Sequence, residues 1–295
     1  MHSAYARTIN LEIAGGRLVS LHGPGPVLSP FGLECAERLP FSAASTGRAV
    51  WSDGRALWVE GSDARLGLHG AARWDPALPT SRRADADAAA SRLRAIASAA
   101  RDDPGAAGRG LLPLLPRLLG LETCAAAGTP PWSPVCERAL PALERLIEGG
   151  RTGTVSALLD AAETLLGLGP GLTPSGDDAL VGYVAALWTA GPSGRALVRD
   201  VAAPLAELAA ARTTRLSREI LGCAARGLAA EPLGRLARRG DVASVAGLLA
   251  CGATSGGDCL VGWAAGLQAS PARGAVTSRR STRCTGTRRD SRDGP

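Results

Sequence analysis

The 295-residue chain contains no lysine, so all 33 of its Lys and Arg residues are arginines. The absence of lysine excludes a phosphate-binding loop of the GxxxxGK[ST] type, which needs that side chain. Aromatic residues make up only 3% of the chain, and no apolar run is long enough to cross a bilayer. The N-terminal residues do not form a charged-then-apolar signal pattern. These absences predict a cytoplasmic protein with no membrane partner.

The seven cysteines are scattered, and no two of them have the CxxC spacing of zinc sites or redox motifs. The three histidines, His2, His22 and His69, do not cluster in the sequence either. These patterns predict reduced thiols and no transition-metal site. A generic Ser-His-Asp hydrolase gains no support, because the chain has no nucleophile elbow.

The net charge of +6 is concentrated at the C-terminal end. Residues 271–295 carry seven arginines and two aspartates, a net charge of +5, and the rest of the chain is nearly neutral. Basic tails can attract phosphates, but a segment rich in Ser, Thr and Gly is typical of disorder. We therefore expect a disordered Arg-rich tail over residues 271–295 and no nucleic-acid partner.

Short strands are predicted in the first 80 residues. Two alternating apolar runs flank Gly15-Gly16, and two more flank Asp53-Gly54, as is typical of hairpins. Trp51 and Trp58 would pair across the second hairpin, and LGLHG adds one more strand. This region is predicted to be a small β-rich domain over residues 1–80.

The pattern then changes to helical spacing. From residue 81 to residue 270, apolar residues recur at intervals of three and four, and Gly or Pro separates most segments. The fold class predicted for the whole chain is therefore α+β. A small N-terminal β domain precedes a larger, mainly helical domain that contains an internal loop-helix repeat.

That repeat joins two distant parts of the helical domain. A shift of 80 residues aligns SGDDALVGYVAAL (175–187) with SGGDCLVGWAAGL (255–267) without gaps. The match predicts two copies of one loop-to-helix unit, packed about a local twofold axis. Gly182 and Gly262 fall inside the two helices, where glycine costs up to about 1 kcal/mol relative to alanine. We expect them to permit close helix–helix contact.

The segment GLGPGLTPSGDD precedes the first helix of the repeat. Ser175 with Asp178, and Ser255 with Asp258, have the spacing of a capping box. Capping does not explain the upstream GLGPGLTP, because one cap needs only one turn residue. Glycines let backbone amides approach a ligand closely, and free N–H groups at a helix start bind anionic oxygens. The segment is therefore our candidate for a ligand-binding or catalytic loop.

Its side chains suggest specific roles. The candidate catalytic residues are the hydroxyl donors Thr173 and Ser175 and the carboxylates Asp177 and Asp178. The carboxylates would suit amide or urea-like N–H groups, or Mg²⁺ as a cofactor. Thr213 or Thr214 also fits as the N-cap of a following helix. The further candidate ligand-binding residues are Gly169, Gly171, Gly176, Thr213, Ser217, Ser255, Gly256 and Asp258.

The signature GLGPGLTPSGDDALVG resembles that of a bacterial family long described as a domain of unknown function. The best-annotated branch of that family is the AllH-type subunit of oxamate carbamoyltransferase. The resemblance covers residues 1 to about 268, and Cys259 and the tail depart from it. It also rests on His2-Ser3-Ala4-Tyr5, Ile9-Asn10-Leu11, ARWDPAL, Thr213-Thr214 with Ser217, and GATSGGDCLVG.

The resemblance implies a subunit of a multi-component enzyme of purine and allantoin nitrogen catabolism. That enzyme exchanges a carbamoyl group between oxalurate and phosphate, giving oxamate and carbamoyl phosphate. The implied partners are an acyl-CoA-synthetase-like subunit, a second, unrelated subunit and a small carbamoyl or oxamate-type ligand. Two alternatives remain open: a non-catalytic scaffold or small-anion-binding protein, and a stand-alone metal-dependent hydrolase that uses Asp177 and Asp178.

Overall fold

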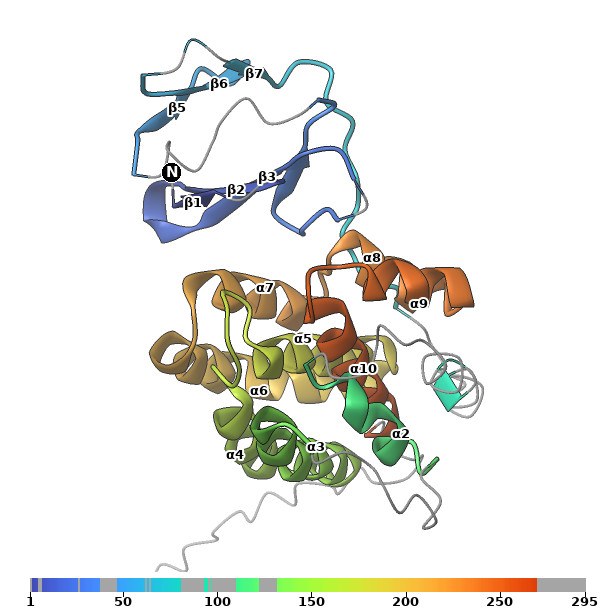
Figure 1. Cartoon of the computed structure of the whole chain (residues 1–295). Coiled ribbons are helices and arrows are strands. Elements are labelled where there is room, and N and C mark those ends of the chain that lie inside the picture. The colour runs from blue at the N-terminus through green and yellow to red at the C-terminus, as the bar shows by residue number, and fades with distance from the viewer. Residues whose placement is uncertain are drawn as a thin grey trace, which may run out of the picture.

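A computed structural model shows a β-rich N-terminal part followed by a helical part (Figure 1). The predicted α+β class is confirmed. The Arg-rich tail and most of residues 81–109 lie outside the described residues, and the domain boundaries at residues 80 and 270 remain predictions. The structure describes residues 2–4, 7–25, 27–37, 47–61, 63, 65–80, 93, 94, 96, 110–121 and 132–269.

Two small sheets form the β-rich part. The first has the order β1-β2-β3-β4, in which β3 and β4 are parallel, and the second has the order β5-β6-β7. Both predicted hairpins are present: β2 pairs with β3, and Trp51 lies opposite Trp58 in the pairing of β5 with β6. The strands are β1 (Ser3–Ala4), β2 (Thr8–Glu12), β3 (Leu18–His22), β4 (Gly32–Glu34), β5 (Val50–Ser52), β6 (Ala56–Val59) and β7 (Arg65–Gly67).

The β2–β3 hairpin has one apolar face and one polar face, because alternate residues of a strand point to opposite sides. Ile9 and Leu11 of β2 and Leu21 of β3 belong to a small buried apolar cluster with Cys35 and Val59. The other face is polar, and its residues lie opposite one another in the register: Thr8 pairs with His22, and Asn10 pairs with Ser20.

The helical part contains the main apolar core, to which almost every described helix contributes. Within the described residues, no helix is long and apolar enough to span a membrane. The helical elements are η1 (Ala14–Gly16) in the β-rich part, then η3 (Leu112–Leu114), α2 (Leu115–Leu118), α3 (Pro134–Thr152), α4 (Val155–Leu165), α5 (Ser175–Thr189), α6 (Pro192–Arg212), α7 (Arg215–Ala225), α8 (Glu231–Arg239), α9 (Val242–Leu249) and α10 (Ser255–Gln268).

The two copies of the repeat, α5 and α10, pack directly against each other. A Cβ atom added to Gly182 would collide with the carbonyl oxygen of Cys259, and one added to Gly262 would collide with the carbonyl oxygen of Ala179. Gly262 and Cys259 are the counterparts of Gly182 and Ala179 after the 80-residue shift. Each glycine therefore faces the counterpart carbonyl of the other helix. This reciprocity supports a local twofold relation, and it confirms that the two glycines permit close packing.

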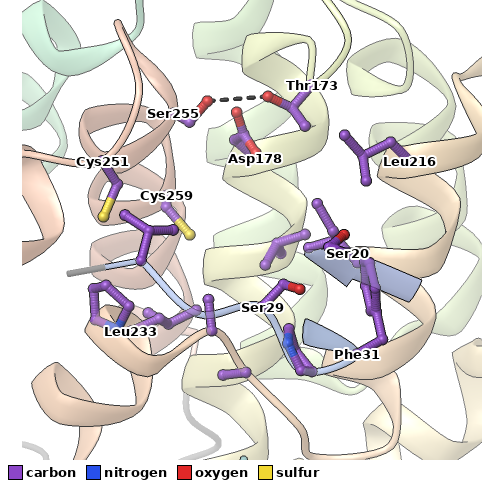
Figure 2. A pocket seen from close by; sticks show the side chains of 18 of the residues that line it. Ser20, Ser29, Phe31, Thr173, Asp178, Leu216, Leu233, Cys251, Ser255 and Cys259 are labelled. Carbon is purple, nitrogen blue, oxygen red and sulfur yellow. Dashed lines mark hydrogen bonds between the residues drawn. The ribbon is translucent and has the colours of Figure 1, made fainter. Parts of the chain in front are cut away.

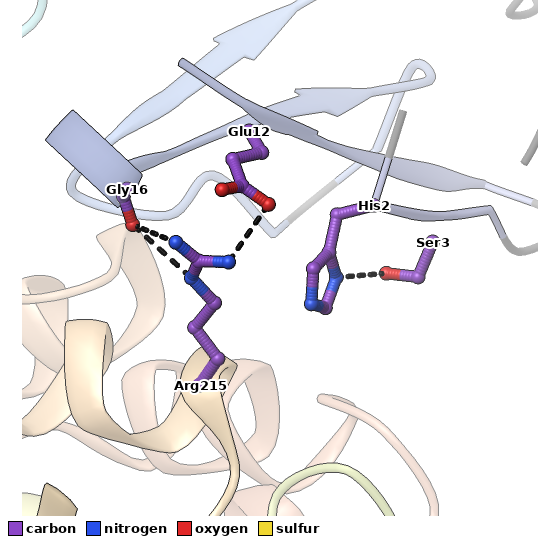
Figure 3. A network of polar contacts seen from close by, with 5 residues as sticks. All are labelled: His2, Ser3, Glu12, Gly16 and Arg215. Carbon is purple, nitrogen blue, oxygen red and sulfur yellow. Dashed lines mark hydrogen bonds and ion pairs between the residues drawn. The ribbon is translucent and has the colours of Figure 1, made fainter. Parts of the chain in front are cut away.

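Arg215, the first residue of α7, connects the helical part to the β2–β3 hairpin (Figure 3). Its Nη1 atom lies 2.7 Å from a carboxylate oxygen of Glu12, and its Nε atom donates to the carbonyl oxygen of Gly16 at 3.1 Å. Backbone hydrogen bonds add to the junction, because Glu231 N donates to Leu28 O at 2.9 Å. These contacts hold the polar face of the hairpin close to the helices.

Candidate functional site

The starts of α5 and α10 differ from the predicted capping boxes. Pro174 is the N-cap residue of α5 and Thr254 is that of α10, and neither makes a side-chain capping hydrogen bond. The capping interpretation of Ser175 and Ser255 is therefore wrong, because both serines already lie inside their helices. Carbonyl groups of the preceding loops bind the first-turn amides instead, as when Gly176 N donates to Leu168 O at 2.9 Å.

Asp177 anchors the glycine-rich loop. It is only 1% exposed. Its Oδ1 atom accepts from the Gly167 amide at 2.9 Å, and its Oδ2 atom accepts from the Thr213 hydroxyl. Burial raises the pKa of Asp177, and hydrogen bonds from Thr213, Gly167 and Ser217 oppose that rise. Because both oxygens are engaged, Asp177 joins the loop to the junction between α6 and α7.

The predicted N-cap of α7 is confirmed, since the Thr214 hydroxyl accepts from Ser217 N at 3.1 Å. The hydroxyls of Thr214 and Ser217 also donate to the carbonyl oxygen of Leu172, at 2.5 and 3.3 Å. Together with Asp177, these residues fix the loop from the side of α7. Thr213, Thr214 and Ser217 therefore serve the conformation of the loop.

Asp178 has different surroundings from its neighbour Asp177. Its side chain is buried, and its Oδ2 atom has no hydrogen-bond partner among the described residues. Burial raises the pKa of Asp178 well above its ordinary value, and the negative charges of Asp258 and Asp177 add to the rise. Hydrogen bonds from the hydroxyls of Ser255 and Thr173 oppose it. Asp178 is therefore a buried carboxyl with one oxygen that no described residue binds.

Asp258 is the counterpart of Asp178 in the second repeat. It is fully buried, its Oδ1 atom accepts from Leu111 N at 2.5 Å, and its Oδ2 atom lacks a partner among the described residues. Burial raises the pKa of Asp258, and hydrogen bonds from Leu111, Ser175 and Thr254 oppose the rise. Each aspartate thus receives a hydroxyl from its own loop and one from the serine of the other repeat.

A cavity of about 190 Å³ lies where these loops meet the polar face of the β2–β3 hairpin (Figure 2). Of the predicted site residues, Thr173, Asp178, Ser255 and Gly256 line it. The Thr173 and Ser255 hydroxyls lie 3.0 Å apart beside Asp178. The other lining residues are Thr8, Asn10, Ser20, His22, Val27, Ser29, Pro30, Phe31, Val181, Leu216, Ile220, Leu228, Ala229, Ala230, Pro232, Leu233, Leu248, Cys251 and Cys259.

The hairpin contributes a hydrogen-bonded polar wall. The Ser20 hydroxyl donates to Asn10 Oδ1 at 2.6 Å. His22 Nε2 accepts from the Ser29 amide at 3.3 Å, so Nδ1 carries the proton and donates to the Thr8 hydroxyl at 3.3 Å. Burial lowers the pKa of His22. The imidazole is therefore neutral at neutral pH.

The remaining predicted residues lie outside the cavity lining. Ser175 and Asp258 are buried, and a hydrogen bond between their side chains joins the two repeats. Gly176 has space only for a hydrogen atom, because an added Cβ would collide with the carbonyl of Leu165. Gly169 and Gly171 have φ values of 111° and 97°, a region that strongly favours glycine. These two residues shape the loop through their backbone.

Thr8, Asn10, Ser20, His22 and Ser29 are site residues that the sequence analysis did not identify. Polar residues that alternate with apolar ones in a hairpin normally face solvent. Here they are largely buried, with Asn10 and Ser20 each 1% exposed. Four of them occupy matched positions on two paired strands, which the register of the hairpin shows.

The arrangement does not fit a magnesium site built on Asp177 and Asp178. Asp177 uses both oxygens in hydrogen bonds to the loop and to Thr213. No group of three or more His, Cys, Asp or Glu that could hold a metal ion occurs within the described part of the chain. A hydrolase mechanism in which both carboxylates bind a metal therefore loses its geometric basis.

The fold and the site define a two-part α+β protein with a cavity between a β hairpin and a pair of repeated helix starts. Residues 165–267 match the family described as oxamate carbamoyltransferase subunit AllH. This match supports the resemblance found in the sequence, and it covers the glycine-rich loop and both copies of the repeat. No curated protein matches the chain. No solved structure matches it either.

Proposed function

We propose that this chain is a subunit of an oxamate carbamoyltransferase-type complex, or of a close relative of it, and that the cavity binds the carbamoyl group of the ligand. The observation that carries the proposal is the free Oδ2 atom of Asp178 beside the Thr173 and Ser255 hydroxyls. The family match over residues 165–267 supports it independently.

A carbamoyl group has an NH₂ group that donates hydrogen bonds and a carbonyl oxygen that accepts them. The free carboxyl oxygen of Asp178 can accept from the NH₂ group. The Thr173 and Ser255 hydroxyls have two protons between them. The proton that is not used in their mutual contact can turn from Asp178 to the carbonyl oxygen of the ligand, which becomes more negative in acyl transfer. The three side chains thus match both ends of the group.

Burial adds to the effect of these contacts. Hydrogen bonds and charges act more strongly in a site from which water is excluded. The polar groups at the cavity are held in place by other residues: Asp177 fixes the loop that carries Thr173, and the second repeat carries Ser255. Preorganised donors of this kind are a large source of transition-state stabilisation in acyl-transfer enzymes.

The test is a carbamoyl phosphate assay with oxamate, using the complex co-purified from its native source or reassembled with its partner subunits. Asp178→Asn and Thr173→Val should each lower kcat/KM by about 10²-fold, the size expected for misplacement of a reacting group. Asp200→Asn is the matched control, because Asp200 is exposed on α6.

Two results would contradict the proposal. An unchanged kcat/KM in both variants would remove the cavity from the reaction. An active complex that requires this chain for assembly, yet tolerates both substitutions, would favour the scaffold alternative. Complex formation should therefore be measured alongside activity, by size-exclusion chromatography of each variant.

A further inference from the structure

Most of the cavity wall is apolar, and this feature goes beyond what carbamoyl recognition requires. The wall is built from both parts of the chain. Val27 and Phe31 come from the β-rich part, Val181 from α5, Leu216 and Ile220 from α7, and Leu233 from α8. Figure 2 shows Thr173, Asp178 and Ser255 at one end of the cavity and Phe31 and Leu233 at the other.

An oxamate-sized anion uses such a cavity poorly. Its carboxylate would lie against hydrocarbon, and burying a charge without a partner is costly. Among the described lining residues there is no arginine that could pair with the carboxylate of an anion. The polar face of the hairpin does not offset this, because Asn10, Ser20 and His22 already bond to one another or to neighbouring residues.

We propose that the ligand of this cavity is an uncharged molecule with a terminal amide or ureido group and an aliphatic or aromatic body. This inference rests on the carbamoyl site of the proposed function, since it assigns the amide end to Asp178, Thr173 and Ser255. Within that proposal it favours a close relative with an uncharged substrate over oxamate carbamoyltransferase itself. The body lies against Phe31, Ile220 and Leu233. The cavity of about 190 Å³ is somewhat larger than an apolar protein cavity of about 150 Å³ that holds one benzene molecule.

Four small probes separate the contributions of the head and the body. Isovaleramide carries both the amide and a branched aliphatic body, acetamide keeps the amide alone, and isovalerate keeps the body with a charged head. Oxamate carries an amide and a carboxylate. NMR titration of the full-length chain with each probe gives the dissociation constants.

Isovaleramide should bind about ten-fold or more tightly than acetamide, because its additional carbon groups leave water. It should also bind more tightly than isovalerate and oxamate. Val27→Trp should weaken isovaleramide binding, since Val27 is 37% exposed at the cavity and can be enlarged without overpacking the core. Val181→Phe should do the same from the buried wall. Val242→Trp is the control, because Val242 is 69% exposed and does not line the cavity.

Tighter binding of oxamate than of isovaleramide would overturn this inference and leave the proposed carbamoyl site intact. Equal affinities for acetamide and isovaleramide would also overturn it, because the apolar wall would then contribute nothing. Absence of binding by all four probes would overturn it as well. The carbamoyl phosphate assay of the complex decides the proposed function separately, so the two failures are distinguishable.

Discussion

The hydroxyl of Thr173 lies 3.0 Å from the hydroxyl of Ser255, although 82 residues separate them in the chain. Thr173 belongs to the loop before α5, and Ser255 is the first residue of α10. The contact joins the two copies of the repeat at the cavity, next to Asp178. The site is therefore a property of the repeat pair, because the first copy and its loop provide Thr173 and Asp178 and the second copy provides Ser255.

This contact predicts an energetic coupling between the two repeats. In a double-mutant cycle with Thr173→Val and Ser255→Ala, the coupling in the free energy of unfolding should be about 0.5–1.5 kcal/mol, the net value of one hydrogen bond. Thr189→Val is the control partner for Thr173→Val, because Thr189 lies at the far end of α5. Urea denaturation gives the free energy of unfolding of each variant. A coupling no larger than that of the control pair would contradict the prediction.

The close contact of α5 with α10 predicts that alanine is not tolerated at its two glycines. Gly182→Ala and Gly262→Ala place a methyl group against a backbone carbonyl of the facing helix, so each should lower the free energy of unfolding by about 1–3 kcal/mol. Gly247→Ala in α9 is the matched control, since an added Cβ there meets nothing within 4 Å. It should be neutral or stabilising by up to about 1 kcal/mol. Equal effects at the three positions would rule out the packing explanation.

The anchoring role of Asp177 predicts a loss of stability that Asp178 does not share. Asp177→Ala leaves the Gly167 amide and the Thr213 hydroxyl without their acceptor, at a cost of about 0.5–1.5 kcal/mol for each lost hydrogen bond. Asp178→Ala removes a carboxyl that has one unpartnered oxygen, so its cost should be smaller. Thermal unfolding of the two variants measures the difference. The reverse order would show that the loop is held elsewhere.

The buried aspartates predict that stability falls as the pH rises above about 4. In the unfolded chain an aspartate loses its proton near pH 4, whereas burial raises the pKa values of Asp177, Asp178 and Asp258 in the folded state. The folded state holds these protons more tightly, so their contribution is fully present below pH 4. It is lost as the pH rises through the raised pKa values.

Asp178→Asn isolates that contribution for one residue. Relative to this variant, the original protein should lose free energy of unfolding as the pH increases from 4 to 8. Urea denaturation across that range measures it. Asp200→Asn, at an exposed position, is the control variant. A flat profile for Asp178→Asn would mean that Asp178 titrates normally in the folded protein.

The repeat and the hairpins were predictable because each leaves a local signal. The 80-residue shift aligned α5 with α10, and the Gly15-Gly16 and Asp53-Gly54 turns marked two hairpins that are present. The capping boxes were predicted wrongly because their spacing ignores the loop carbonyls, which already bind the first-turn amides. Local spacing identifies the residues of a helix start but does not determine their partners.

The hairpin wall of the cavity could not be predicted from the same signals. Thr8, Asn10, Ser20 and His22 have the alternation of a solvent-facing surface, and only the docking of the hairpin onto α7 and α8 buries them. That docking depends on long-range contacts such as Arg215 with Gly16, which are 199 residues apart. Contacts between residues so far apart in the chain produce no periodic pattern in the sequence.

His22 provides the last prediction, because its burial should be visible in a titration. Burial lowers the pKa of His22, and the negative charge of Glu34 offsets only part of the effect. An NMR titration should therefore give a midpoint below about 6.5, the value of an unperturbed histidine. His22→Gln identifies the resonance by its loss. Protonation of a neutral His22 would also break its hydrogen bond from the Ser29 amide, so stability should fall as the pH drops through that midpoint. A midpoint above 6.5 would mean that the polar wall is open to water.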